Sequence, residues 1–222
     1  MKSEQRVYRQ LRSAAPTLMK LYIPTLILLV GFVLLKIFRG VKTSDMMRDP
    51  AQITGSNPFL GLLSNLGILF WCSSAAICLF CSAVLRKNQK DRNYASFFLL
   101  SGLITSFLLI DDLFMFHDFV MPVCLHIHEV FVYIFYAVLI STWLFVFRRT
   151  ILGTNWSILL LALVFFAVSM LIDFIPGKLL GRWLFEDGSK FLGIVTWMYY
   201  FTQTCFQRLD LVLNDIVNLE RD

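Results

Sequence analysis

The stretch LIDDLFMFHDFVMPVCLHIHE, from Leu109 to Glu129, decides how the rest of the sequence is interpreted. It holds four carboxylates and all three histidines of the chain, and a strongly apolar run lies on either side of it. Charged side chains are rare within membrane-spanning segments, because leaving water costs them free energy. We therefore expect this stretch both to connect two helices and to carry function.

The composition is typical of a membrane protein. Of the 222 residues, 58% are hydrophobic, and the mean hydropathy is +0.70. A soluble domain of this length could not cover so much apolar surface, so we expect membrane lipid around most of the chain. The net charge of +5 does not indicate a nucleic-acid partner, because the basic residues flank the apolar segments.

Six apolar segments predict a single all-α domain, a polytopic bundle of about six transmembrane helices. About 20 apolar residues are needed to cross a hydrocarbon core of roughly 30 Å. The expected spans are 21–38, 59–85, 94–120, 123–147, 155–175 and 191–213. The third and fourth spans are expected to form a hairpin with a tight turn at Met121-Pro122.

The basic residues predict the orientation of the bundle. With the N-terminus inside, the inner segments hold 13 Lys or Arg residues and the outer segments hold seven. Because inner segments of membrane proteins are enriched in Lys and Arg, we expect both termini to be cytoplasmic in a multi-pass protein of the cell membrane.

This topology gathers the unusual polar residues at the outer end of the bundle. The third, fourth and fifth spans and the segment before the sixth all contribute. The residues are Asp111, Asp112, His117, Asp118, His126, His128, Glu129, Asp173, Glu186 and Asp187. Asp111 and Asp112 are expected within the hydrocarbon region, where an unpaired charge costs roughly 2.5 to 3.5 kcal/mol. Adjacent acids there need partners, protonation, water or a cation.

Helical spacing selects the members of a candidate site. Asp111 and Asp118 are seven residues apart and share a helical face, and His126 and Glu129 are three apart on the next helix. Mixed carboxylate and imidazole ligands suit zinc, iron or manganese. The predicted ligands of such a metal are Asp111, Asp118, His126, Glu129 and Asp173. The candidate catalytic residues are Asp111, Asp112 and Glu129.

The same spacing makes Asp112 and His117 point to other sides of the third span. His117 and His128 are therefore interpreted as residues of the membrane interface. Cys78 and Cys81 form a CxxC pattern inside an apolar run, and we interpret them as buried thiols that pack as small hydrophobic side chains.

Three functions remain open at this point. The first is a metal-dependent membrane enzyme, a hydrolase or an oxidoreductase, that acts on a lipid or another apolar small molecule. The second is an ion- or proton-coupled transporter or channel that uses Asp111 and Asp112. The third is a non-catalytic scaffold or assembly subunit in which the polar cluster packs helices. No nucleophilic elbow, phosphate loop or Rossmann glycine pattern is present.

Overall fold

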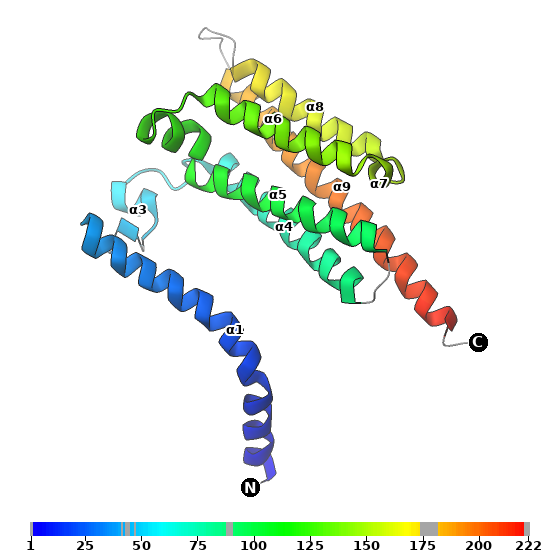
Figure 1. Cartoon of the computed structure of the whole chain (residues 1–222). Helices are drawn as coiled ribbons and strands as arrows, with labels where there is room; N and C mark the ends of the chain where they lie inside the picture. Colours follow the sequence, from blue (N-terminus) through cyan, green and yellow to red (C-terminus); the bar gives the residue numbers. More distant parts are fainter. Residues whose placement is uncertain are drawn as a thin grey trace. The chain divides into compact units, whose positions relative to one another are not determined.

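The computed structural model describes residues 2–40, 42, 45–46, 48–87, 91–173 and 182–219. All regular structure in these ranges is helical (Figure 1). The chain divides into two compact units, Met1–Leu60 and Gly61–Asp222.

The first unit contains a long apolar helix. Helix α1 (Lys2–Arg39) includes the apolar segment Leu18–Arg39, and none of its most apolar part is buried. The short helix α3 (Pro50–Thr54) begins after Asp49, whose carboxylate accepts a hydrogen bond from the Ala51 N–H at 2.8 Å. A helix with apolar side chains exposed along its length requires lipid or another apolar surface around it.

The second unit is a bundle in which α4 packs against α5 and α9, and α8 packs against α9 (Figure 1). Its elements in chain order are α4 (Leu62–Lys87), α5 (Arg92–Phe114), the π-helix η1 (Phe116–Cys124), α6 (Glu129–Val146), α7 (Arg148–Leu152), α8 (Trp156–Asp173) and α9 (Arg182–Leu219).

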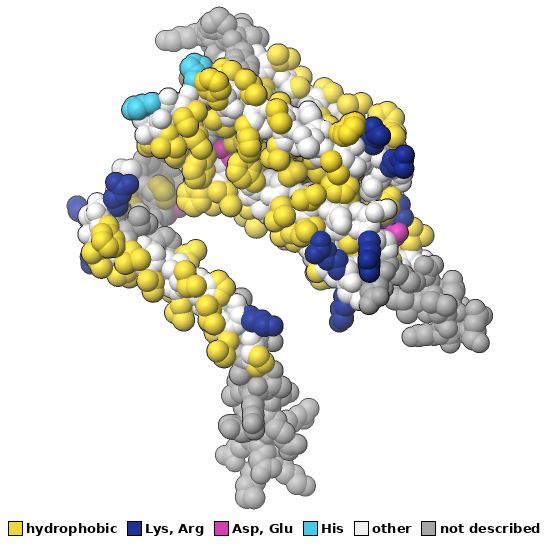
Figure 2. All heavy atoms as spheres, in the orientation of Figure 1, with side chains coloured by type: hydrophobic (Ala, Val, Ile, Leu, Met, Phe, Trp, Pro, Cys, Tyr) yellow, Lys and Arg dark blue, Asp and Glu magenta, His cyan; other side chains and the backbone are white. Residues whose placement is uncertain are grey.

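Four helices within the described residues are long and apolar enough to cross a membrane: Leu18–Arg39, Leu62–Lys87, Arg92–Phe114 and Trp156–Asp173. A shorter apolar helix covers Val130–Val146. Hydrophobic side chains spread over the outside of the helices (Figure 2). The predicted all-helical fold with membrane-length apolar helices is confirmed.

One half of the bundle in the second unit is filled by aromatic rings. Phe97 of α5 stacks on Trp143 of α6 with ring centroids 5.6 Å apart, and Trp197 of α9 meets Phe201 at 5.1 Å. Phe97, Trp197 and Phe201 are at most 1% exposed. These contacts close the part of the bundle near the N-terminus of α5 and the C-terminus of α6.

Three cysteines lie in the same core. Cys78 and Cys81 of α4 and Cys205 of α9 are buried. All five cysteines are free thiols. The thiols occupy small volumes between α4 and α9 and help these helices to pack closely.

The end of α5 differs from the expected span. The helix stops at Phe114, where Met115 takes a left-handed conformation with φ of 52°, and the chain continues as η1 rather than as an α-helix to Val120. The Asp111 carboxylate accepts the backbone N–H of His117 at 3.1 Å. In a continuous α-helix that N–H would bond to a carbonyl four residues earlier. Pro122 lies inside η1, so the expected tight hairpin does not form.

The start of α9 also differs from the expected span. This helix begins at Arg182, so Glu186, Asp187 and Lys190 lie on its first turns, before the expected start of the span at residue 191. Residues spaced three or four apart lie on one side of a helix. The helical start therefore directs Glu186 and Lys190 toward the same side of α9.

The close approach of α4 and α5 provides a stability prediction. A Cβ added at Gly102 of α5 would lie 2.8 Å from Leu79 Cγ and 3.2 Å from Cys78 Cβ, whereas nothing lies within 4 Å at Gly188 of α9. Overpacking costs about 1–3 kcal/mol, and replacing a helical glycine with alanine gains about 1 kcal/mol. We expect Gly102→Ala to lower the melting temperature in detergent and Gly188→Ala to leave it unchanged or raise it. A higher melting temperature for Gly102→Ala would contradict this packing.

Candidate functional site

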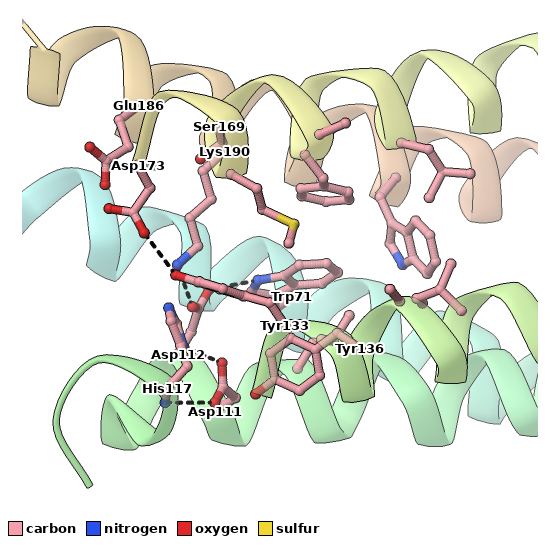
Figure 3. A pocket seen from close by; sticks show the side chains of 18 of the residues that line it. Trp71, Asp111, Asp112, His117, Tyr133, Tyr136, Ser169, Asp173, Glu186 and Lys190 are labelled. Carbon is pink, nitrogen blue, oxygen red and sulfur yellow. Dashed lines mark hydrogen bonds and ion pairs between the residues drawn. The ribbon is translucent and has the colours of Figure 1, made fainter. Parts of the chain in front are cut away.

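A cavity of about 320 Å³ lies between α4, α5, η1, α6, α8 and α9 (Figure 3). Polar side chains from five of these elements line it. They are Asp111, Asp112, His117, Tyr133, Tyr136, Ser141, Ser169, Asp173, Glu186, Asp187 and Lys190. The main apolar lining residues are Trp71, Leu108, Ile140, Leu163, Phe166 and Trp197.

The cavity is polar at one end and apolar at the other. On α8, Asp173 and Leu163 both line it and are ten residues apart, which is roughly 15 Å of helix. On α9, Glu186 lies at the polar end and Trp197 at the apolar end. We call the five carboxylates of the polar end (Asp111, Asp112, Asp173, Glu186 and Asp187) the acidic end. The cavity is therefore shaped for a molecule with unlike ends.

The Asp111–His117 pair is the most buried polar contact of the acidic end. His117 Nδ1 lies 2.5 Å from Asp111 Oδ2, and the backbone N–H of His117 donates to Asp111 Oδ1. Asp111 is 4% exposed and His117 is 8% exposed. An ionised Asp111 carboxylate would only accept hydrogen bonds, and Nδ1 would then carry the proton in this pair. The contact fixes both the orientation and the tautomer of the imidazole, as carboxylates do for catalytic and metal-binding histidines.

Asp112 is held by partners from two other helices. The ammonium of Lys190 on α9 lies 2.6 Å from Asp112 Oδ1, and the indole N–H of Trp71 on α4 donates to Oδ2 at 2.8 Å (Figure 3). The Asp112 side chain is only 11% exposed. A carboxylate this deep in an apolar bundle requires such partners, since a lone charge there is costly.

Two tyrosines of α6 extend the polar end across the cavity. The Tyr133 hydroxyl donates to Asp173 of α8 at 3.1 Å, and the Tyr136 side chain points toward Asp111 (Figure 3). Polar side chains from α5, η1, α6, α8 and α9, together with the Trp71 indole N–H of α4, thus meet around one small volume.

The structure brings together three of the residues predicted from the sequence. Asp111, Asp112 and Asp173 all line the cavity. His126 does not line the cavity. Residues 126–128 are not helical, so the expected three-residue helical spacing between His126 and Glu129 does not apply. His126 is exposed, with φ of 56°. Histidine side chains are visible at the surface in Figure 2.

The remaining predicted ligands, Asp118 and Glu129, lie in η1 and at the first position of α6, and their side chains are outside the described residues. His128 is exposed at the start of α6, where its ring accepts the Val130 N–H at 3.4 Å.

Sequence reasoning missed two residues that matter most here. His117, expected at the interface, is buried against Asp111, because the chain leaves α-helical geometry at Met115. Lys190 was not assigned to the site, although it reaches Asp112 directly. One signal was present in the sequence: a buried acid pair needs a cation, and Lys190 follows Glu186 by one helical turn.

Three residues of the acidic end lie close enough together to be candidate metal ligands. One ligand atom from each of Asp111, Asp112 and His117 lies within 4.8 Å of the others. One imidazole and two carboxylates suit zinc, iron or manganese. This group shares only Asp111 with the ligand set expected from the sequence.

The fold and the cavity define an all-helical protein with membrane-length apolar helices and a carboxylate-rich internal site. Residues 21–204 match a family described as "Domain of unknown function (DUF8692)", and the chain belongs to this family. The matched range contains every residue that lines the cavity. Comparisons with curated proteins and with solved structures found no match.

A double-mutant cycle tests the Asp111–His117 contact. His117→Ala would leave the Asp111 carboxylate without its buried partner, and breaking a buried pair from one side costs about 3–5 kcal/mol. We expect a loss of that size in the free energy of unfolding, measured by denaturation in detergent with a chelator present. Adding Asp111→Asn should restore much of the loss, because the remaining group is neutral.

His126→Ala is the matched control for this cycle, because His126 is exposed and outside the cavity. It should change the free energy of unfolding by about 1 kcal/mol or less. Additive effects of His117→Ala and Asp111→Asn would show that the two side chains do not interact.

Proposed function

We propose that the chain is a multi-pass membrane protein with about six spans and both termini cytoplasmic, in the cell membrane. The four membrane-length helices and the apolar segment Val130–Val146 support this number, and α9 is long enough to add the sixth. In the second unit, Arg86, Arg148 and Arg208 lie toward the end of the bundle opposite the acidic end. This distribution of charge supports a cytoplasmic position for that end.

We propose further that the protein is a metal-dependent membrane enzyme acting on a lipid or another amphipathic small molecule. The observation that carries this proposal is the buried Asp111–His117 pair beside Asp112, at the polar end of a cavity whose other end is apolar. A polar reacting group would lie at the acidic end, and an apolar chain would extend toward Leu163 and Trp197.

The residues of the acidic end would have distinct roles. Asp111, Asp112 and His117 would bind the metal, and the contact between Asp111 and His117 would also hold the imidazole in position. Asp173 and Glu186 line the same cavity and would serve as a further ligand or as proton acceptor. A bound zinc ion would supply activated water for hydrolysis, and iron or manganese would supply oxidation chemistry.

The packing of the bundle favours an enzyme over a transporter or channel. A through-path would have to cross the aromatic layer of Phe97, Trp143 and Phe201, where rings lie in direct contact. The cavity lining includes Trp197 but none of these three rings. A pure scaffold is less well supported, because the polar groups surround a cavity rather than fill it.

Elemental analysis of the detergent-purified protein tests the proposal. We expect a stoichiometric transition metal in the wild-type protein and its loss in Asp112→Asn and in His117→Ala. His126→Ala, which changes an exposed histidine outside the cavity, should retain the metal.

Two results would contradict a metal enzyme at this position. One is a wild-type protein without metal after reconstitution with zinc, iron and manganese. The other is a bound metal that survives both cavity substitutions.

A further inference from the structure

We propose that the cavity opens sideways into membrane lipid between α6 and α8, and that an alkyl chain of the lipid substrate enters through this opening. Three small residues form it, Ala137 and Ser141 of α6 and Ala167 of α8, and we call them the lateral opening. This inference rests on the proposed function, because it assigns the entry route and the apolar part of the substrate for the same site.

Helix α6 separates the cavity from the outside of the bundle. Its cavity-lining residues recur every three or four positions and are Tyr133, Tyr136, Ala137, Ile140 and Ser141. Such spacing places side chains on one face of a helix. The opposite face carries exposed hydrophobic side chains, which include Phe131, Phe135 and Val138. In a membrane-spanning bundle these side chains contact lipid, so a single helix stands between lipid and the cavity.

Aromatic rings fill the seam between α6 and α5. Phe107 of α5 meets Phe135 and Tyr136 of α6 edge-to-face, with ring centroids 5.8 and 6.0 Å apart. Rings at this separation are in direct contact. This side of α6 is therefore closed beside the cavity.

Small side chains lie along the seam between α6 and α8. Most of the described lining residues are buried or half-buried, and those that are exposed are Ala137, Ser141, Ala167 and Asp187. Asp187 lies at the acidic end, on the first turns of α9. The other three residues lie on α6 and α8. The cavity is therefore accessible at two places, the acidic end and the lateral opening.

The three residues of the lateral opening lie at a similar depth. Helices α6 and α8 run in opposite directions, and the Tyr133 hydroxyl donates to Asp173 at 3.1 Å where α6 starts and α8 ends (Figures 1 and 3). A helix rises about 1.5 Å per residue, so Ala137, Ala167 and Ser141 lie about 6, 9 and 12 Å further along their helices from this contact. The lateral opening is thus set back from the acidic end, toward the apolar end of the cavity.

The packing of α6 leaves space at these small residues. Its main backbone contacts are with η1 and α7, its neighbours in the chain, whereas α8 packs closely along α9. Small residues usually let two membrane helices approach closely. Because α6 and α8 do not have such a close interface, the short side chains of the lateral opening leave room between them.

The surroundings of the lateral opening suit an alkyl chain. Val138 and Val168 are exposed on the outside of α6 and α8, and Ile140 and Leu163 line the cavity behind them. A polar head group would lose its hydrogen bonds to water on this route, and an alkyl chain has none to lose. We therefore place the head group at the acidic end and one chain of the same lipid in the lateral opening.

Photolabelling of the full-length protein in phosphatidylcholine vesicles tests the proposal. The probe is a phosphatidylcholine with a diazirine near the end of one acyl chain, and mass spectrometry locates the labelled residues. We expect labelling of Ile140 and Leu163, which line the cavity, in addition to exposed residues such as Leu171.

Substitutions then locate the route. In Ala137→Phe and in Ala167→Phe a ring occupies the lateral opening, and labelling of Ile140 and Leu163 should fall about tenfold or more relative to Leu171. Val138→Phe and Val168→Phe are the matched controls, because they place the same ring one residue further on, at exposed positions outside the cavity. Both controls should be labelled like the wild type. If a phenylalanine variant does not fold, leucine at the same position is the smaller replacement.

Labelling of the wild type at exposed residues alone would overturn the proposal. Labelling of Ile140 and Leu163 that persists in both Ala137→Phe and Ala167→Phe would also overturn it, because the chain would then enter over the acidic end. The assay needs neither metal nor turnover. A labelled cavity in a protein that binds no metal would refute only the proposed enzyme, and a metal-loaded protein with an unlabelled cavity would refute only this inference.

Discussion

The contact between Asp111 and His117 is the constraint on which the rest of the site depends. A carboxylate inside an apolar bundle must find partners, and Asp111 takes both the imidazole and the backbone N–H of the same residue. Taking that N–H is incompatible with a continuous α-helix. The chain therefore changes to the left-handed Met115 and the wide helix η1, which folds His117 back toward the cavity.

The two ends of the second unit are built differently. At the aromatic end, rings such as Phe97, Trp143 and Phe201 pack directly and leave no room. At the acidic end, α6 approaches its neighbours through Tyr133 and Tyr136, whose hydroxyl ends are polar. Aromatic rings pack together at one end of the bundle. Ion-paired and hydrogen-bonded side chains line a cavity at the other end.

Hydropathy and spacing predict the fold class and the membrane-length helices, because both depend on local composition. They also predict that Asp111, Asp112 and Asp173 lie at one end, since apolar segment length determines that end. They do not predict His117 as a partner of Asp111, because helical periodicity fails once Met115 becomes left-handed. Residues 126–128 are not helical either. The three-residue spacing between His126 and Glu129 therefore does not predict that their side chains share a face. The contact of Lys190 with Asp112 could not be predicted without knowing that α9 begins at Arg182.

X-ray absorption spectroscopy of the metal-loaded protein tests the central claim most directly, because it reports the atoms around the metal. The account predicts a shell of nitrogen and oxygen ligands with one imidazole, and loss of the imidazole signal in His117→Ala but not in His126→Ala. The thiols Cys78, Cys81 and Cys205 are buried in the same bundle and would add sulfur ligands if the metal were bound there instead. A sulfur shell, or an imidazole signal that persists in His117→Ala, would contradict the account.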